Sequence, residues 1–223
     1  VRMLESLDDL ELMGEEDGLP GMIFLETPAN PTLQVHSIKI AADWAKARTS
    51  DDHRIVVAVD NTFLGPILQR PLELGADLNV YSATKYIGGH SDLVAGAVSG
   101  ESEAMAKVFE YRTFLGGMAD PHTSWMLARS METLAIRVER QSRSARKVLD
   151  HLQKSPGIPV KGINKIFSAW AEDLAGSGDF KSAGIAQEQQ VNGGGMFAME
   201  LPGGRKAAFA FLDSLQHFKL AVS

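Results

Sequence analysis

The sequence predicts an α/β fold with a mostly parallel sheet that carries helices on both faces. Strand-like and helix-like segments alternate along the first half of the chain, in the rhythm of βαβ units. The strand-like segments, such as residues 55–59, are continuously apolar, as is typical of strands buried on both faces. Two of these strands run directly into polar residues, which predicts that reactive side chains gather at one edge of the sheet.

The elements of the first half follow in a regular order. Residues 21–26 are predicted to form a short buried strand, which ends before the prolines that follow. Ser37 is the predicted N-cap of a helix, because apolar residues recur after it at helical spacing. Residues 55–60 and 78–81 are predicted as further strands, and residues 93–98 as the last strand of this half.

The second half begins with a change of pattern. Residues 121–152 have apolar residues at the spacing of one long helix, which could link two domains. The chain then becomes less regular and richer in glycine and serine, and a turn is expected at the triple glycine 193–195. A strand over 196–201 and a helix over 207–217 complete the prediction.

Composition allows a globular enzyme and excludes some other classes. The chain has 223 residues and a formal net charge of −6, which argues against a general nucleic-acid binder. Cysteine is absent, so disulfides and thiol catalysis are excluded. No apolar run reaches the roughly 18 residues of a membrane span, and we expect a soluble, cytoplasmic protein without membrane or nucleic-acid partners. The basic group is predicted to be the solvated face of the long helix; it comprises Arg137, Arg140, Arg143, Arg146 and Lys147.

Lys85 carries the strongest chemical signal in the sequence. It follows an apolar strand directly and lies between hydroxyl side chains and glycines, whereas lysine is normally a solvated surface residue. The preceding strand ends in Asp60. A lysine and a carboxylate at neighbouring strand ends are what pyridoxal 5′-phosphate (PLP) requires, because its aldehyde forms a Schiff base with lysine and its pyridinium nitrogen pairs with a carboxylate. The phosphate takes hydroxyls, for which Ser82 and Thr84 are candidates; their alternative role is turn capping.

Two weaker patterns point to other sites. His90 and Asp92 could suggest a metal pair, but no second histidine stands at ligand spacing, so we expect a structural role and no metal. The triple glycine lacks the Gly-Lys-Ser/Thr ending of a nucleotide-binding loop.

Four motifs stand in order along the chain: residues 26–33 (ETPANPTL), 60–63 (DNTF), 66–77 (PILQRPLELGAD) and 82–92 (SATKYIGGHSD). Together they resemble the Cys/Met-metabolism family of PLP enzymes. That family includes cystathionine γ-synthase, cystathionine β- and γ-lyases, methionine γ-lyase and the homoserine-ester sulfhydrylases.

The resemblance implies the PLP-dependent transferase fold type I. Residues 1–120 would form an N-terminally incomplete large PLP-binding domain, residues 121–155 a long linking helix, and residues 156–223 an incomplete, smaller C-terminal α/β domain. Family members run to roughly twice this length. The tyrosine that stacks on the cofactor and the arginine that binds the substrate carboxylate are therefore expected outside this chain.

The resemblance also implies roles for single residues. Lys85 would hold PLP as a Schiff base and then move protons, and Asp60 would keep the ring nitrogen protonated. Asn30 would hydrogen-bond the ring hydroxyl, and Thr62 would line the ring. Ser223 matches the serine near the substrate carboxylate.

The expected activity is PLP-dependent elimination or replacement at the γ- or β-carbon of a sulfur amino acid or homoserine derivative. The segment 113–118 before the long helix resembles the γ-lyase and γ-synthase branches more closely. The expected partners are an amino-acid substrate and further copies of the chain, in a homotetramer built from dimers. The alternative is a non-catalytic truncated remnant or oligomerisation module; an aminotransferase of related fold fits the motif at 82–92 less well.

Overall fold

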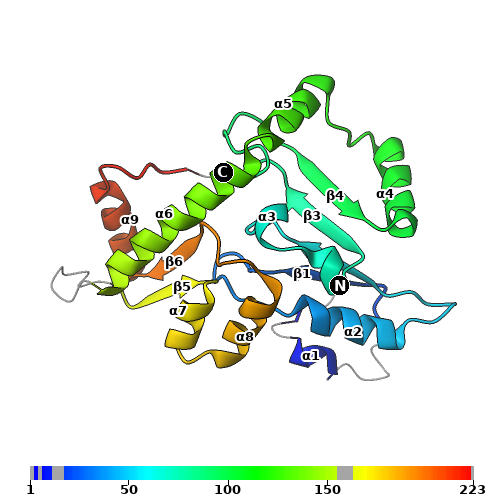
Figure 1. Cartoon of the computed structure of the whole chain (residues 1–223), viewed down its shortest axis with the longest axis horizontal. Helices are drawn as coiled ribbons and strands as arrows, with labels where there is room; N and C mark the ends of the chain where they lie inside the picture. Colours follow the sequence, from blue (N-terminus) through cyan, green and yellow to red (C-terminus); the bar gives the residue numbers. More distant parts are fainter. Residues whose placement is uncertain (1–2, 5–6, 12–17, 155–162, 222–223) are drawn as a thin grey trace.

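The computed structural model describes residues 3–4, 7–11, 18–154 and 163–221 (Figure 1). Its principal sheet has the order β1-β2-β3-β4, formed by Met22–Glu26, Val56–Asp60, Leu78–Ser82 and Gly96–Gly100. The first three strands are parallel to one another, and β4 pairs with β3 in the antiparallel direction. The predicted α/β fold with a mostly parallel sheet is confirmed.

Helix α2 (Ile38–Arg48) packs against one face of this sheet. Ser37 caps the helix as predicted, since its side chain accepts a hydrogen bond from the Ile40 backbone N–H. The helix buries Ile38 and Trp44 in a core shared with the inward residues of β1 and β2. The opposite face of β1 is less covered than the prediction of helices on both faces implies, because Met22 and Phe24 are about half exposed. Short helical segments precede or follow this layer: α1 (Asp8–Glu11), α3 (Gly65–Leu68) and η2 (Pro71–Leu74).

A second core fixes the segment that follows β3. Ala83 and Ile87 of this segment pack with Leu134 and Val138 of the long helix α6 (Leu134–Lys154). The same cluster includes Leu64 of the segment that follows β2. The chain around Lys85 is therefore held between the sheet and α6 by apolar contacts on both sides of the lysine.

The segment predicted as one linking helix is two helices, α5 (Pro121–Met131) and α6. The chain turns between them, where the Thr133 backbone N–H and hydroxyl both donate to the Ser130 carbonyl, at 3.3 and 3.4 Å. Periodicity alone could not show this break, because Glu132 and Thr133 are compatible with a helix. Helix α4 (Ser102–Leu115) precedes α5 and was not predicted.

The prediction of a solvated basic face is wrong for two of its five members. Arg137 and Arg146 are half-buried, whereas Arg140, Arg143 and Lys147 are exposed. Arg146 pairs with Asp150 of its own helix and with Asp173 of α7 (Ala171–Gly176). The basic group thus divides between a solvated part and two side chains that join α6 to other elements.

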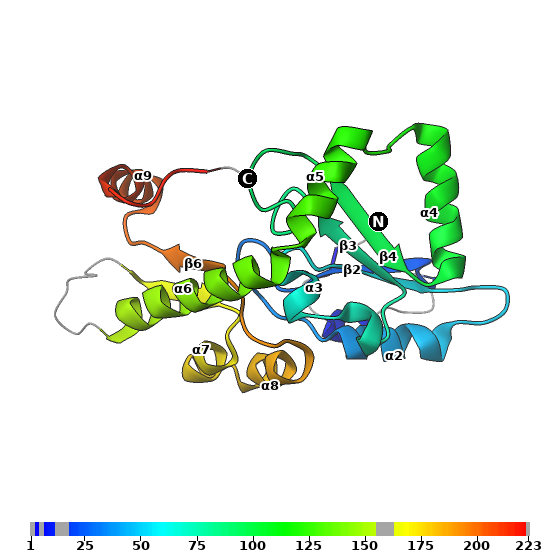
Figure 2. The same ribbon diagram turned by 45° about the horizontal axis from the view of Figure 1, so that its top comes forward.

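The C-terminal part contains a second, two-stranded antiparallel sheet of β5 (Lys165–Ser168) and β6 (Phe197–Glu200). Helix α6 runs alongside it, and α7 and α8 (Phe180–Gln189) lie next to each other (Figure 2). The predicted turn at the triple glycine is confirmed, and α9 (Gly204–Ser214) covers most of the last predicted helix. No helix among the described residues is long and apolar enough to cross a membrane.

Candidate active site

The carboxyl ends of β2 and β3 place Asp60 and the Lys85 turn at one edge of the sheet. A series of hydrogen bonds connects them. The Thr62 backbone N–H donates to Asp60 Oδ1 at 3.0 Å, and the Ser82 backbone N–H donates to Thr62 Oγ1 at 2.8 Å. The Lys85 backbone N–H then donates to the Ser82 carbonyl at 3.0 Å. Four of the predicted site residues are therefore brought together by the backbone that follows two adjacent strands.

Lys85 lies in a series of turns over residues 83–88 and is half-buried. The turn is closed by backbone bonds of 2.7 Å, from Gly88 N–H to the Ala83 carbonyl and from Gly89 N–H to the Lys85 carbonyl. Within the described ranges, neither the Lys85 amine nor the Ser82 hydroxyl makes a hydrogen bond or ion pair with another residue. A half-buried amine and hydroxyl without protein partners can bind a ligand.

Thr84 is placed differently from Ser82. Its hydroxyl accepts from the Ala95 backbone N–H at 2.9 Å and lies 3.2 Å from the Ala95 carbonyl, to which it donates. These bonds fasten the Lys85 turn to the segment that leads into β4. A hydroxyl has a single proton, so in this arrangement Thr84 donates to the protein. Its role at a phosphate stays a prediction.

Glu26 is a neighbour of Asp60 that the sequence reasoning missed. It ends β1 in register with Asp60 at the end of β2. Partial burial raises the pKa of the Glu26 carboxyl although the residue is exposed overall, the Asp60 charge raises it further, and the Asn30 backbone N–H acts in the opposite direction. The available signal was the carboxylate at the end of the first predicted strand. Asn30 itself is exposed, in the turn that follows Glu26.

Two other predicted positions, Ser223 and His90, remain to be placed. Ser223 lies outside the described residues. His90 is exposed, and its Nδ1 lies 2.7 Å from the Gly88 carbonyl; its structural role stays a prediction. In the described part of the chain, no group of three or more His, Asp or Glu side chains is arranged to hold a metal ion.

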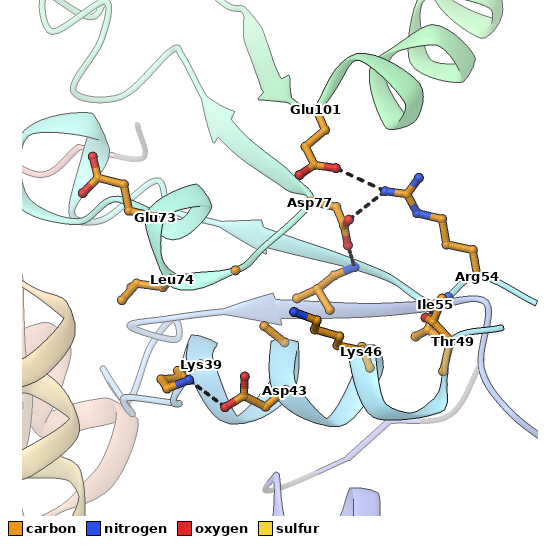
Figure 3. A pocket seen from close by; sticks show the side chains of 14 residues that line it. Lys39, Asp43, Lys46, Thr49, Arg54, Ile55, Glu73, Leu74, Asp77 and Glu101 are labelled. Atoms are coloured by element: carbon orange, nitrogen blue, oxygen red, sulfur yellow. Dashed lines mark hydrogen bonds and ion pairs between the residues drawn. The ribbon is translucent and has the colours of Figure 1, made fainter. Parts of the chain in front are cut away.

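A cavity lies at the opposite edge of the sheet, where β2 and β3 begin (Figure 3). Its volume is about 670 Å³, and charged side chains such as Lys39, Asp43 and Glu101 line it. None of the predicted site residues borders it. We therefore locate the candidate site by its chemistry at the carboxyl edge rather than at this cavity.

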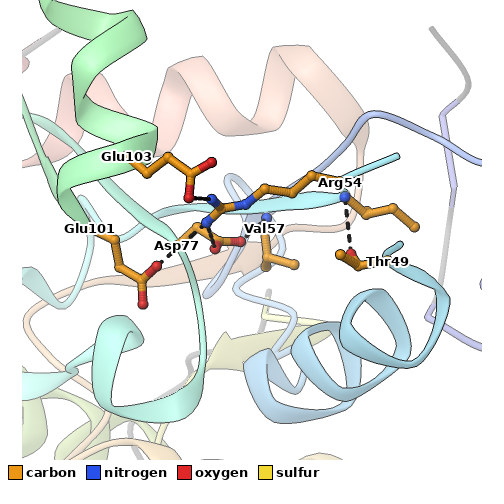
Figure 4. A network of polar contacts seen from close by, with 7 residues as sticks. Thr49, Arg54, Val57, Asp77, Glu101 and Glu103 are labelled. Carbon is orange, nitrogen blue, oxygen red and sulfur yellow. Dashed lines mark hydrogen bonds and ion pairs between the residues drawn. The ribbon is translucent and has the colours of Figure 1, made fainter. Parts of the chain in front are cut away.

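Arg54 lines that cavity and lies at the centre of a network of polar contacts (Figure 4). Its guanidinium pairs with Asp77 at 2.9 Å and with Glu101 and Glu103 at the start of α4. The hydrogen bonds that Arg54 donates to Asp77 and Glu103 raise its pKa, so the guanidinium stays charged. Asp77 also accepts from the Val57 backbone N–H at 2.7 Å. This network joins the starts of β2, β3 and α4, which is a structural role.

The residues at the carboxyl edge fit PLP in their chemistry. Lys85 offers an amine that has no partner among the described residues, and the hydrogen-bond series connects the Asp60 carboxylate to the Lys85 backbone N–H. Ser82 lies between them in the sequence, and its backbone N–H and carbonyl both belong to the hydrogen-bond series. These are the groups that bond the aldehyde, the ring nitrogen and the phosphate of this cofactor.

Comparison with known proteins gives a consistent result. The sequence model of the family described as "Cys/Met metabolism PLP-dependent enzyme" matches residues 10–223. The chain is 37% identical over 221 residues to a cystathionine β-lyase of Lactococcus lactis subsp. cremoris (strain MG1363), covering 99% of the chain and 53% of the relative. It is 39% identical over 204 residues to an L-methionine γ-lyase of Pseudomonas deceptionensis, covering 91% of the chain and 47% of the relative.

Solved structures share the fold. The cystathionine γ-synthase from Xanthomonas oryzae pv. oryzae, solved in complex with aminoacrylate and cysteine, matches with a TM-score of 0.78 and 33% identity. The match covers 92% of this chain and 49% of that one. The chain spans about half the length of the curated relatives it matches.

Proposed function

The chain belongs to the Cys/Met-metabolism family of PLP-dependent enzymes, and from this premise we propose that the protein catalyses elimination or replacement at the γ- or β-carbon of a sulfur amino acid or homoserine derivative. The observation that carries the proposal is the hydrogen-bond series from Asp60 through Thr62 and Ser82 to Lys85. It supports a common site for a carboxylate and a lysine that lie 25 positions apart in the sequence.

Each residue at this edge has a proposed task. Lys85 holds PLP, and Asp60 pairs with the ring nitrogen, while Thr62 keeps the Asp60 loop against β3. Ser82 donates to the phosphate, and Thr84 either joins it or keeps its bonds to Ala95. Two assignments rest on the resemblance alone, namely Asn30 at the ring hydroxyl and Ser223 near the substrate carboxylate.

When bound, PLP supplies a ring that accepts electrons from the substrate α-carbon. The protein contributes the proton transfers, for which Nζ of Lys85 is the proposed base at the α-carbon. Asp60 supports this step, since its negative charge favours a protonated ring nitrogen. Loss of a further proton from the β-carbon precedes departure of a γ-substituent, whereas a β-substituent departs after the first proton.

The assembly and location of the protein are part of the proposal. We propose that copies associate into a homotetramer in the cytoplasm. Exposed apolar side chains on α4 support association: Phe109 is 50% exposed, Phe114 85% and Leu115 81%. Light scattering coupled to size exclusion tests this point, and a monodisperse monomer at micromolar concentration contradicts it. Association without turnover would instead favour the oligomerisation module.

The activity is tested with purified protein and added PLP. Cystathionine distinguishes the regiochemistry, because γ-elimination releases cysteine, 2-oxobutanoate and ammonia, whereas β-elimination releases homocysteine, pyruvate and ammonia. We expect one of the two 2-oxo acids together with ammonia, without an amino acceptor, and no release by Lys85→Ala. Product formation that requires an added 2-oxo acid acceptor would identify a transaminase. No reaction with cystathionine, methionine or O-acylhomoserine plus cysteine contradicts the proposal.

A further inference from the structure

One arginine of α6 contacts the backbone on which Lys85 is mounted. Nη1 of Arg137 donates to the Tyr86 carbonyl at 2.8 Å, and Nη2 lies 3.3 Å from the Ile87 carbonyl, to which it also donates. These carbonyls belong to the two residues that follow Lys85. A side chain about fifty positions away in the sequence thus binds the turn that carries the lysine.

The same guanidinium is anchored to the junction of α5 and α6. Nη2 donates to the Ser130 carbonyl at 2.8 Å, and Nε donates to Thr133 Oγ1 at 3.1 Å. A guanidinium directs its N–H donors in a rigid plane, so these bonds fix the Lys85 turn in orientation as well as distance. A lysine ammonium at this position has one nitrogen and cannot span the same acceptors.

Gly89 makes room for this contact. Its φ is +74°, a conformation that favours glycine. A Cβ at this position would lie 1.9 Å from Nη1 of Arg137 and 2.6 Å from its Cζ. The glycine that closes the turn onto the Lys85 carbonyl therefore also admits the guanidinium.

The interaction differs from surface ion pairing. In the portion of the chain that the structure describes, Arg137 pairs with no carboxylate, and its acceptors are neutral oxygens. Burial lowers the pKa of Arg137, so holding the charged side chain here has a desolvation cost. Its neighbour Arg143, by contrast, is 70% exposed and pairs with Glu139. The contacts of Arg137 fit a geometric task better than a solubilising one.

We propose that Arg137 is a positioning residue for Lys85, whose turn it fixes so that the amine is presented at the carboxyl edge of the sheet. The inference rests on the proposed function in one respect: it takes PLP to be the aldehyde that reacts with Lys85. Displacing a reacting group by about 1 Å can slow a reaction by about 100-fold. Loosening the turn should therefore slow attachment of PLP to Lys85 without unfolding the protein.

The test compares Arg137→Gln with Arg143→Gln, a matched change at an exposed site of the same helix. Two readouts are measured at equal folded fraction: the rate at which borohydride-stable PLP accumulates on Lys85, and the hydrogen–deuterium exchange of the peptide spanning 83–90. For Arg137→Gln we expect attachment slowed by about tenfold or more and faster exchange in that peptide. Arg143→Gln should match the wild type in both.

Arg137→Lys keeps the positive charge and loses the planar donors, so it should fall between the wild type and Arg137→Gln. If Arg137→Gln does not fold, Arg137→Lys replaces it as the test variant. Attachment and exchange at wild-type levels in either folded variant would overturn the positioning role. A wild-type protein that attaches no PLP to Lys85 would refute the proposed function instead, and the exchange comparison would still decide whether Arg137 holds the turn.

Discussion

Glu26 and Asp60 end adjacent strands in register, and burial together with the Asp60 charge raises the pKa of the Glu26 carboxyl. A raised carboxyl pKa means that the folded protein binds more protons than the unfolded chain above pH 4.5, the ordinary pKa of this group. The unfolding free energy therefore falls as the pH rises from 4.5 through the pKa of folded Glu26. At neutral pH, the ionised Glu26 carboxylate therefore lowers the unfolding free energy.

Glu26→Gln should remove this cost. We expect the unfolding free energy at pH 7 to rise by a small amount, about 0.5 kcal/mol or less, since Glu26 is exposed. The gain should vanish below about pH 4, where the wild-type carboxyl is protonated as well. Denaturant unfolding at the two pH values measures both quantities. A gain that persists or grows at the lower pH contradicts this assignment.

Asp60→Asn separates chemistry from folding. An amide keeps the oxygen that accepts from Thr62 and loses the negative charge, so the local backbone should persist. We expect turnover to fall by about 100-fold or more, the size of a lost electrostatic contact to a reacting group. Steady-state kinetics and denaturant unfolding are compared on the same preparation. Wild-type turnover in this variant would remove Asp60 from the ring nitrogen.

At the scale of residues, the sequence marks those candidates whose signal lies in their own segment of the chain. Asp60 and Lys85 could be singled out as candidates because each stands at or just after the end of a recognisable apolar strand. Glu26 was missed because its proximity to Asp60 depends on the pairing of β1 with β2. Arg137 was assigned to a solvated face because its acceptors, the Tyr86 and Ile87 carbonyls, become neighbours only after folding.

At the scale of elements, Asp77 joins the start of β3 to the start of β2. Its carboxylate accepts from the Val57 backbone N–H and pairs with Arg54, and its side chain is only 19% exposed. Removing the carboxylate leaves the N–H of the buried Val57 without a partner, and the loss of an acceptor for a buried donor costs roughly 1–3 kcal/mol.

Asp77→Ala should therefore lower the unfolding free energy by roughly 1–3 kcal/mol. Asp77→Asn should lose less, because its amide oxygen can still accept from Val57. Glu103→Gln is the control; Glu103 pairs with the same arginine but is 81% exposed, so its loss should cost roughly 0–1 kcal/mol. Equal losses at Asp77 and Glu103 in denaturant titrations would show that the backbone bond contributes nothing.

Elements with a strong local signal were predictable, and the others were not. The strands ending at Glu26, Asp60 and Ser82 have continuous apolar runs, and α2 has both a cap and an apolar face. Helix α4 buries no residue, and its exposed apolar side chains are not confined to the single stripe that predicts a packed helix. The break between α5 and α6 depends on bonds to the Ser130 carbonyl, which periodicity does not report.

At the scale of the molecule, a buried amide network connects the C-terminal part to the site edge. Gln189 of α8 accepts from the Ile38 backbone N–H at 3.2 Å and donates to the His36 carbonyl at 3.0 Å. It also donates to Gln69 Oε1 at 3.3 Å, and Gln69 donates to Asn61 Oδ1 at 3.0 Å. Asn61 directly follows Asp60, so the network reaches the candidate site. No sequence pattern marked these amides, because their partners lie up to 153 positions apart.

Gln189→Ala should weaken the whole molecule. It leaves the Ile38 N–H without its acceptor, whereas the His36 carbonyl keeps its hydrogen bond from the Thr27 hydroxyl. We expect the loss to lower the unfolding free energy by roughly 1–3 kcal/mol. Gln187→Ala changes an exposed glutamine of the same helix and should stay within roughly 0.5 kcal/mol of the wild type. Thermal and denaturant unfolding measure both variants. Indistinguishable losses would mean that the network does not join the two parts.

The central claim is that Lys85 forms the covalent link to PLP, and one measurement tests it most directly. The visible absorption of the purified protein is recorded with added PLP, then borohydride is added and the labelled peptide is mapped, in parallel with Lys85→Ala. We predict a visible band that borohydride removes, a label on the peptide containing Lys85, and neither in Lys85→Ala. A label on another lysine, or a label that persists in Lys85→Ala, would contradict the account.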